Sequence, residues 1–267
     1  MTDLTTALLA AYDEHMRGLG AARDGETRQS DGPLLRTYGG FRGFITSPTA
    51  DIGLRGAELD ELITRQRDFF AARGEAVEWK TRGHDLPADL PERLTAAGFA
   101  AEAPETVLIG LAAELATATP APEGIVLRRV SALADTRRIA AMESEVWGED
   151  WSWLAADLAD RAAADPDGFL VVVAETDTRT PEVVSAAWLV RNPGTEFAGL
   201  WGGSTLAAWR GRGIYRSLVA HRARWALDRG IRYLQVDASP DSAPILRRLG
   251  MHAVTTTTPY VWTPPAS

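Results

Sequence analysis

The chain has 267 residues, a length typical of about two domains, and 45% of its residues are hydrophobic, which is ample for buried cores. Its formal net charge of −8 argues against a nucleic-acid partner, because nucleic-acid-binding surfaces are usually basic. The absence of cysteine excludes disulfides, thiolate nucleophiles and cysteine-ligated zinc sites. The four histidines lack the spacing of metal ligands, so no metal site is expected.

The sequence carries no targeting or membrane signal. Its first residues, MTDLTTALLAAYDEH, lack the basic start and apolar core of a signal peptide. No apolar run approaches the roughly 20 residues that span a bilayer. We therefore expect a cytoplasmic protein with no membrane partner.

Helices and strands alternate along the first half of the chain, as the spacing of apolar residues indicates. The predicted elements are a helix (4–16), a polar loop (23–32), a strand and turn (34–45), a helix (56–74), a strand (75–80), a short helix (90–99) and a strand (105–111). The segment ATATPAPEG (116–124) then reads as a linker. It predicts a boundary near Pro120 between two domains, 1–119 and 120–267.

The second half shows a similar alternation. Its predicted elements are a strand (125–130), two helices (131–147 and 149–164), a hairpin (169–175 with 183–190), a strand (197–206), a helix (214–230), a strand (231–237), a short helix (242–250) and a final edge strand (256–262). FFAARGEAVEWK in the first half aligns with WALDRGIRYLQV in the second. We interpret this as a degenerate internal duplication; the alternative is two α/β halves that merely share helix-cap glycines.

The segment WRGRGIYRSLV (209–219) predicts an anion site. A glycine-rich turn that opens a helix leaves backbone N–H groups unpaired at the positive end of the helix dipole. Arg210, Arg212 and Arg216 add charge-assisted hydrogen bonds. Two common phosphate loops do not fit: GxxxxGK[ST] is absent, and a GxGxxG motif would require glycine where Arg216 stands.

The run Arg210-Gly211-Arg212-Gly213-Ile214 resembles the coenzyme A loop of the GNAT N-acetyltransferases, which has Arg or Gln, two residues, Gly, one residue, then Gly or Ala. Tyr215 replaces the last small residue. The resemblance extends over about residues 124–263, and the ending LRRLGM is similar to the family's LYEKLGF segment. The first half resembles a degenerate second copy of this family's domain, in which the corresponding segment SPTADIGLRGAEL lacks the Arg/Gly loop.

This resemblance implies a mixed α/β (α+β) fold of two GNAT-like domains, each with a mostly antiparallel central sheet flanked by helices. It also implies acetyl-CoA as the acyl donor. The residues that would hold the donor are Gly203, Ser204 and Thr205 on the strand, Ser239 near the last helix, and Arg210, Gly211, Arg212, Gly213, Ile214, Tyr215 and Arg216 in the loop.

The acid and base of such a reaction are less defined. Leu246 stands where the family often has an acidic tyrosine, although a thiol of pKa about 8.5 leaves as thiolate without much help. Tyr260 and Tyr215 are substitute acids, each with a packing role as the alternative. Glu196, before the loop strand, is the candidate base; the alternative is a solvated turn residue.

The acceptor is expected near the junction of the two helices after Pro120, where Glu143, Glu145 and Asp150 occur. The substrate-binding candidates are Glu145, Trp147 and Trp151, with Trp153 close by. Three tryptophans in seven residues form either an aromatic wall of the acceptor pocket or a plug in a domain interface.

The leading hypothesis is transfer of an acetyl or short acyl group from acyl-CoA to the amine of a small molecule, by direct attack, because no cysteine is present to carry the acyl group. The first domain would be structural. One alternative is a CoA-binding sensor or scaffold without turnover, and another is a nucleotide-binding domain that ATP or NAD would stabilise.

Overall fold

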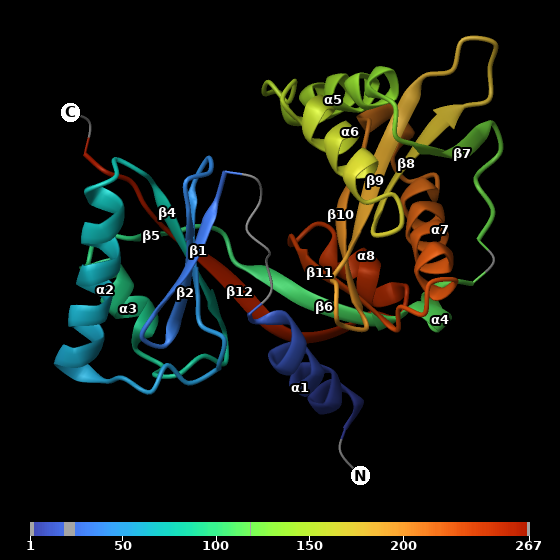
Figure 1. Cartoon of the computed structure of the whole chain (residues 1–267). Helices are drawn as coiled ribbons and strands as arrows, with labels where there is room; N and C mark the ends of the chain where they lie inside the picture. The colour runs from blue at the N-terminus through green and yellow to red at the C-terminus, as the bar shows by residue number, and fades with distance from the viewer. Residues whose placement is uncertain (1–2, 19–24, 118, 266–267) are drawn as a thin grey trace. The chain divides into compact units, whose positions relative to one another are not determined.

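A computed structural model describes residues 3–18, 25–117 and 119–265 (Figure 1). The chain divides into two units. The first unit comprises Met1–Leu108, Asp237–Ile245 and His252–Ser267, and the second comprises Ile109–Val236 and Leu246–Met251. The chain therefore returns to the first unit after completing most of the second. The predicted domain boundary near Pro120 stays a prediction.

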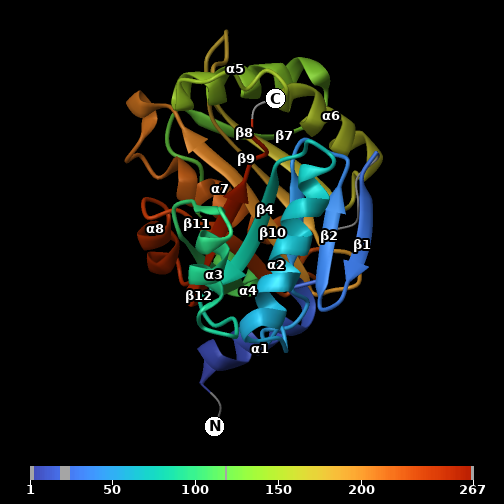
Figure 2. The ribbon, with the colours of Figure 1, turned by 90° about the vertical axis from the view of Figure 1, so that its left-hand side faces the viewer.

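The first unit is a mixed sheet covered by helices. Its elements are α1 (Leu4–Met16), β1 (Thr27–Asp31), β2 (Leu34–Tyr38), β3 (Gly43–Thr46), α2 (Gly56–Ala71), β4 (Val77–Arg82), α3 (Leu90–Ala96), β5 (Ala100–Ala101) and β12 (His252–Trp262). β1, β2 and β3 pair antiparallel, β3 pairs parallel with β4, and β4 pairs antiparallel with β12. Figure 2 shows α2 lying across these strands. Its apolar face, which includes Leu59, Leu62 and Phe70, packs on Ile45 and Trp79 in the core.

Two predictions in this unit are wrong. Residues 27–31 were expected in a loop, but they form β1, which pairs with β2 from Thr27↔Tyr38 to Asp31↔Leu34; residues 23 and 24 of that loop lie outside the described residues. β1 has no buried residue, so it shows no hydrophobic alternation. The final strand is not an edge strand, because β12 pairs with both β4 and β5.

The second unit is also a mixed sheet covered by helices. Its elements are β7 (Ile125–Val130), α5 (Leu133–Trp147), α6 (Leu154–Ala164), β8 (Phe169–Thr176), β9 (Val183–Arg191), β10 (Phe197–Thr205), a 3₁₀ turn (Ala207–Trp209) and α7 (Ile214–Leu227), with α4 (Ala112–Leu115) before them. β6 (Glu105–Leu111), β11 (Tyr233–Ala238) and α8 (Ala243–Arg248) each belong partly to both units. The predicted hairpin is confirmed as β8 and β9. α4 was not predicted.

Both units share one strand plan, which agrees with an internal duplication. In the second unit β8, β9 and β10 pair antiparallel, and β10 pairs parallel with β11. In the first unit β1, β2 and β3 likewise pair antiparallel, and β3 pairs parallel with β4. A helix connects the parallel strands in each case, α2 in the first unit and α7 in the second. Gly74 and Gly230, which follow these helices, both have positive φ, as helix-terminating glycines often do.

Charged side chains fix the start of α5 against the sheet. Arg128 on β7 bonds Asp135 on α5 at 2.7 Å and Glu175 on β8 at 2.9 Å, and Arg138 also pairs with Glu175. Hydrogen bonds from Arg128 lower the pKa of Asp135 and of Glu175. This cluster holds the helix that carries the buried carboxylate of the site described below.

Acid should weaken this cluster. Both carboxyl pKa values are lowered in the folded state, so their contribution to stability is present above the unfolded values of about 4 and is lost as pH falls through the folded values. We expect the free energy of unfolding, measured by urea titration, to fall steeply below about pH 4. Asp135→Asn with Glu175→Gln should cost about 1–3 kcal/mol at pH 7 and flatten this fall.

The exposed Asp160 of α6 provides the control, since no ion pair involves it among the described residues. Asp160→Asn should leave the curve unchanged. A double variant with the same acid sensitivity as the wild type would contradict the role of the cluster.

Candidate functional site

The site lies where two parallel strands separate. β10 pairs with β11 only from Phe197↔Tyr233 to Gly199↔Gln235, whereas its pairing with β9 continues to Thr205↔Ser185. Beyond Gly199, one edge of β10 is held by β9, and no pairing with β11 is found within the described residues. Backbone N–H and C=O groups on that edge are available to a ligand that lies along the strand.

A bulge interrupts β10 at this open edge. The register with β9 shifts between Gly202 and Ser204, and Gly202 and Gly203 have φ values of 65° and 95°, which other residues rarely adopt. A Cβ at Gly202 would lie 2.5 Å from the Trp188 ring, and one at Gly203 would lie 2.5 Å from the Tyr215 ring. Both positions therefore require glycine for space as well as for conformation.

The loop from Arg210 to Arg216 has the features of an anion site. Gly213 is the N-cap of α7 at φ 86° and supplies no side-chain cap. Among the described residues, no backbone acceptor engages the amide N–H groups of residues 211–216. A Cβ at Gly211 or Gly213 would meet no atom within 4 Å, so the space beside these two glycines is open. Arg212 lies over the Trp209 ring, and Arg210 donates to the Thr205 carbonyl at 3.0 Å.

The corresponding loop of the first unit supplies its own anion. The Asp51 carboxylate accepts the Gly53 N–H at 2.7 Å and pairs with Arg55, the N-cap residue of α2. Asp51 therefore already binds the Gly53 amide and the Arg55 guanidinium, the groups that an external anion would use. Arg212 of the second-unit loop has no such carboxylate partner among the described residues and lies over the Trp209 ring instead.

A buried carboxylate faces the bulge from α5. Glu143 is 2% exposed, and its Oε2 accepts the Trp147 Nε1–H at 2.9 Å. Burial raises its pKa, although the nearby Ser204 hydroxyl and the Trp147 indole partly oppose the rise. Its Oε1 is buried and accepts no hydrogen bond from any described residue. A carboxylate with one free oxygen beside Ser204 is a candidate proton acceptor.

Glu143 and Glu145 both lie in the stretch expected to bind the acceptor, and Glu145 is the predicted substrate-binding residue. The two residues are separated by about 200° around the helix, so only one of them faces the sheet. Glu143 lies on the buried face with Ile139 and Met142, and Glu145 is exposed. The spacing from the apolar residues of α5 was the signal that could have identified Glu143.

The tryptophans after Glu143 form an exposed aromatic surface. Trp147 and Trp151 have ring centroids 6.4 Å apart, and Trp151 and Trp153 stack at 5.5 Å. Trp147 is 60% exposed and Trp153 is 58% exposed. The Trp147 ring is held beside Glu143 by its indole N–H, so an aromatic face and a carboxylate adjoin at the junction of α5 and α6.

Other predicted residues lie elsewhere. Glu196 is exposed at the start of β10, next to Arg232, and by strand geometry is about 20 Å from Gly202. Tyr260 is 8% exposed in the apolar core of the first unit. Ser239 belongs to the segment assigned to the first unit, and its hydroxyl accepts the Ser242 N–H at 3.3 Å. Leu246 is fully buried.

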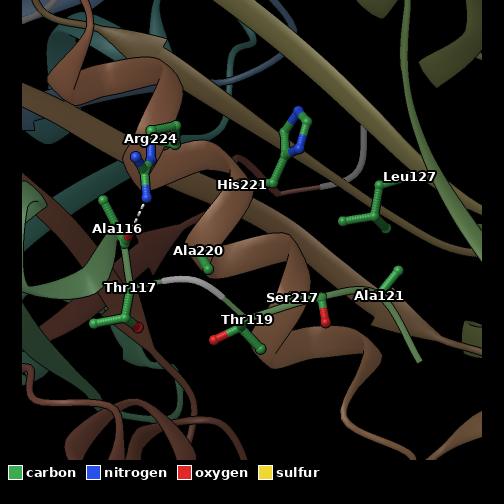
Figure 3. A pocket seen from close by; sticks show the side chains of 9 residues that line it. All are labelled: Ala116, Thr117, Thr119, Ala121, Leu127, Ser217, Ala220, His221 and Arg224. Carbon is green, nitrogen blue, oxygen red and sulfur yellow. Dashed lines mark hydrogen bonds between the residues drawn. The ribbon is translucent and has the colours of Figure 1, made fainter.

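The outer face of α7 carries a separate cavity of about 270 Å³ (Figure 3). Ser217 donates to the Pro120 carbonyl at 2.9 Å and Arg224 donates to the Ala116 carbonyl, so the segment before β7 is fastened to this face. His221 is one of the residues that line the cavity, and burial lowers its pKa. These residues lie on the side of α7 opposite Tyr215, so they do not contribute to the bulge.

The described residues contain no group of three or more His, Asp or Glu placed to hold a metal ion. They also contain no helix that is long and apolar enough to cross a bilayer.

Comparison with known proteins gives one family match, which lies mostly in the second unit. Residues 133–251 match the family model described as Acetyltransferase (GNAT) family. No curated protein matches the chain. A GCN5-related N-acetyltransferase from Kribbella flavida has a similar structure, with a TM-score of 0.72 at 16% identity, covering 100% of this chain and 98% of that one.

Two further structures are similar. A tandem GNAT protein from the clavulanic acid biosynthesis pathway has a TM-score of 0.64 at 14% identity, over 92% of this chain and 86% of its own. A GCN5-related N-acetyltransferase from Sphaerobacter thermophilus has a TM-score of 0.61 at 18% identity, over 89% of this chain and 76% of its own. These likenesses confirm the predicted mixed α/β fold.

The buried carboxylate should destabilise the folded protein at neutral and alkaline pH. Because the folded-state pKa of Glu143 is raised, its contribution to stability is fully present below the unfolded value of about 4.3 and is lost as pH rises through the folded value. Glu143→Gln keeps an acceptor for Trp147 and should raise Tm by about 2 °C or more at pH 8. This gain should disappear near pH 4.

Calorimetry at both pH values tests this, with Glu149→Gln as the control because Glu149 is exposed on the same segment. A lower Tm for Glu143→Gln than for the wild type at pH 8 would show that the ionised carboxylate is stabilising.

Proposed function

We propose that the second unit transfers an acetyl or short acyl group from acyl-CoA to the amine of a small molecule, because residues 133–251 match the family model of the GNAT acetyltransferases. One observation supports this most strongly. The C-terminal end of β10 brings together an open strand edge, a glycine bulge, an anion loop and a buried carboxylate with a free oxygen.

The residues present fit coenzyme A. The unengaged amides of residues 211–216 and the side chains of Arg212 and Arg216 would hold the pyrophosphate, since helix N-termini and arginines both favour phosphate. The open space at Gly211 and Gly213 admits phosphate oxygens close to the backbone. The free edge of β10, through Ser204 and Thr205, would pair with the pantetheine amides.

The chain's residues would promote direct attack by the amine. Acyl-CoA supplies an acyl carbon activated by a thiolate leaving group. The amine nitrogen bonds to that carbon as the C–S bond breaks, and amide N–H groups at the bulge stabilise the charge on the carbonyl oxygen. Glu143 Oε1 accepts the proton that the amine loses, and the thiolate takes a proton from solvent.

The acceptor surface is consistent with an amine. Trp147 and Trp151 present aromatic faces beside the Glu143 carboxylate, and cations are attracted to both groups. The carboxylate then removes a proton from the same nitrogen that it has bound. This surface would set the acceptor's position, whereas the loop sets that of the donor.

A CoA-binding module without turnover remains the competing function. Leu246 motivates it, since this buried residue occupies the position where the resemblance expects a tyrosine acid. One measurement distinguishes the two functions: the release of free CoA in the presence of amines.

The first experiment measures CoA affinity by calorimetry and CoA release with a thiol-reactive dye; the chain has no cysteine, so the protein gives no background. We expect binding of acetyl-CoA and release with at least one member of a broad amine panel. Tight binding without release for any amine would favour the non-catalytic module. Stabilisation by ATP or NAD but not by CoA would contradict both functions.

Gly213→Val should weaken CoA binding at least 100-fold while the protein stays folded. A branched side chain would fill the space in front of the loop amides and would disfavour the φ of 86° that orients them. Gly194→Val is the matched control, because Gly194 has φ 77°, open surroundings and a turn outside the loop. Equal CoA affinities for the two variants would remove the loop from the donor site.

Glu143→Gln should lower kcat by about 10²–10³-fold, because the amide cannot accept a proton. The wild-type rate should fall on acidification at a pH above the ordinary glutamate value of about 4.3, since burial raises the pKa of Glu143. This acidic limb should be absent in the variant. Steady-state kinetics from pH 5 to 9 measure both effects, and an unchanged profile would assign the base elsewhere.

A further inference from the structure

Arg222 on α7 is a buried arginine that reaches the sheet beneath the bulge. It is 1% exposed. Its Nη1 donates to the carbonyl of Trp188 on β9 at 3.1 Å and to the carbonyl of Trp201 on β10 at 3.1 Å, and its Nε donates to the Leu218 carbonyl at 3.2 Å. The guanidinium thus joins the two strands at the pair Trp201↔Trp188, immediately before the register shift.

This cation has no counter-ion. Every hydrogen bond of Arg222 goes to a neutral backbone carbonyl, and no carboxylate among the described residues pairs with it. Burial lowers its pKa to about 10, so it remains charged at neutral pH. Burying an unpaired charge costs several kcal/mol of desolvation free energy. An apolar residue of similar size would avoid this cost. A charge retained at such a cost indicates a functional role.

The position of the guanidinium determines the direction of one peptide. The peptide between Trp201 and Gly202 is planar and trans, so the Gly202 N–H points opposite to the Trp201 carbonyl. With that carbonyl held toward β9 and Arg222, the N–H faces the edge where β10 has separated from β11. Glycine on both sides of the next peptide would otherwise allow it to rotate.

Neighbouring side chains complete this support. Tyr215, two turns before Arg222 on the same face of α7, packs against Gly203, and the Trp188 ring packs against Gly202. Arg222 therefore lies under a bulge in which an aromatic ring packs against each of the two glycines.

We propose that Arg222 is a positioning residue for acyl transfer: it fixes the Trp201 carbonyl so that the bulge amides face the thioester carbonyl oxygen, and its uncompensated charge strengthens the positive potential there. This inference rests on the proposed function, because it needs acyl-CoA along β10. It assigns a role to a residue that touches neither the donor nor the acceptor.

The test uses three variants of the full chain. Arg222→Met removes the charge with similar length, and Arg222→Lys retains the charge with fewer donors. Arg224→Met is the matched control on the opposite face of α7, where Arg224 donates to the Ala116 carbonyl. Isotope-edited infrared spectra of bound [1-¹³C]acetyl-CoA report the polarisation of the thioester carbonyl without any acceptor.

In the wild type and in Arg224→Met, we expect the carbonyl stretch to move to lower frequency on binding. In Arg222→Met the shift should fall by at least about half, and in Arg222→Lys it should be intermediate. With an accepted amine, kcat of Arg222→Met should fall about 10²-fold, while KM for acetyl-CoA changes less than about 3-fold, because the lost interaction acts mainly in the transition state.

Thermal unfolding separates this role from a structural one. Arg222→Met should stay folded, because removing a buried unpaired charge offsets the loss of its hydrogen bonds. If it does not fold, Arg222→Lys carries the test with the same two readouts. Equal infrared shifts in the wild type and the folded variant, or a loss of kcat that only follows the folded fraction, would overturn the inference. Failure of the wild type to bind acetyl-CoA would overturn the proposed function itself and this inference with it.

Discussion

The second unit depends on one constraint, the parting of β10 from its parallel neighbour while it stays paired with β9. A strand held on one edge and free on the other presents fixed backbone groups to a ligand without losing its place in the sheet. The bulge at Gly202 and Gly203 falls within this free stretch, and the loop before α7 follows directly after it. The elements of the proposed acyl-transfer site are arranged along this single strand.

Two buried ionisable groups converge on that strand from different helices. Glu143 of α5 lies beside Ser204, and Arg222 of α7 bonds the Trp201 carbonyl. Neither has a charged partner among the described residues, and each is unfavourable to the fold taken alone. Their presence near one bulge is better explained by charge that develops during a reaction than by stability. The neighbouring strands β8 and β9 are almost entirely buried, and such packing commonly offsets the cost of burying charged groups at a functional site.

The first unit shows that the strand plan alone does not make such a site. It has three antiparallel strands and a parallel pair joined by a helix, as the second unit has. Its loop, however, places Asp51 against its own amide and against Arg55. The two loops therefore share a backbone plan but differ in the side chains that surround their amides.

The order of most elements and the glycine-rich turn before α7 could be predicted from the sequence, because helix periodicity, apolar runs and the glycines around Gly213 are local signals. It missed β1, whose polar residues carry no alternation, and it misplaced β12, since strand neighbours are set by pairing between distant segments. The helical spacing of apolar residues could have favoured Glu143 over Glu145, but only the tertiary structure shows the burial of Glu143 and the hydrogen bond from Arg222 to the Trp201 carbonyl. Burial, pKa and the orientation of a peptide depend on what packs against a residue, and only the folded chain provides those neighbours.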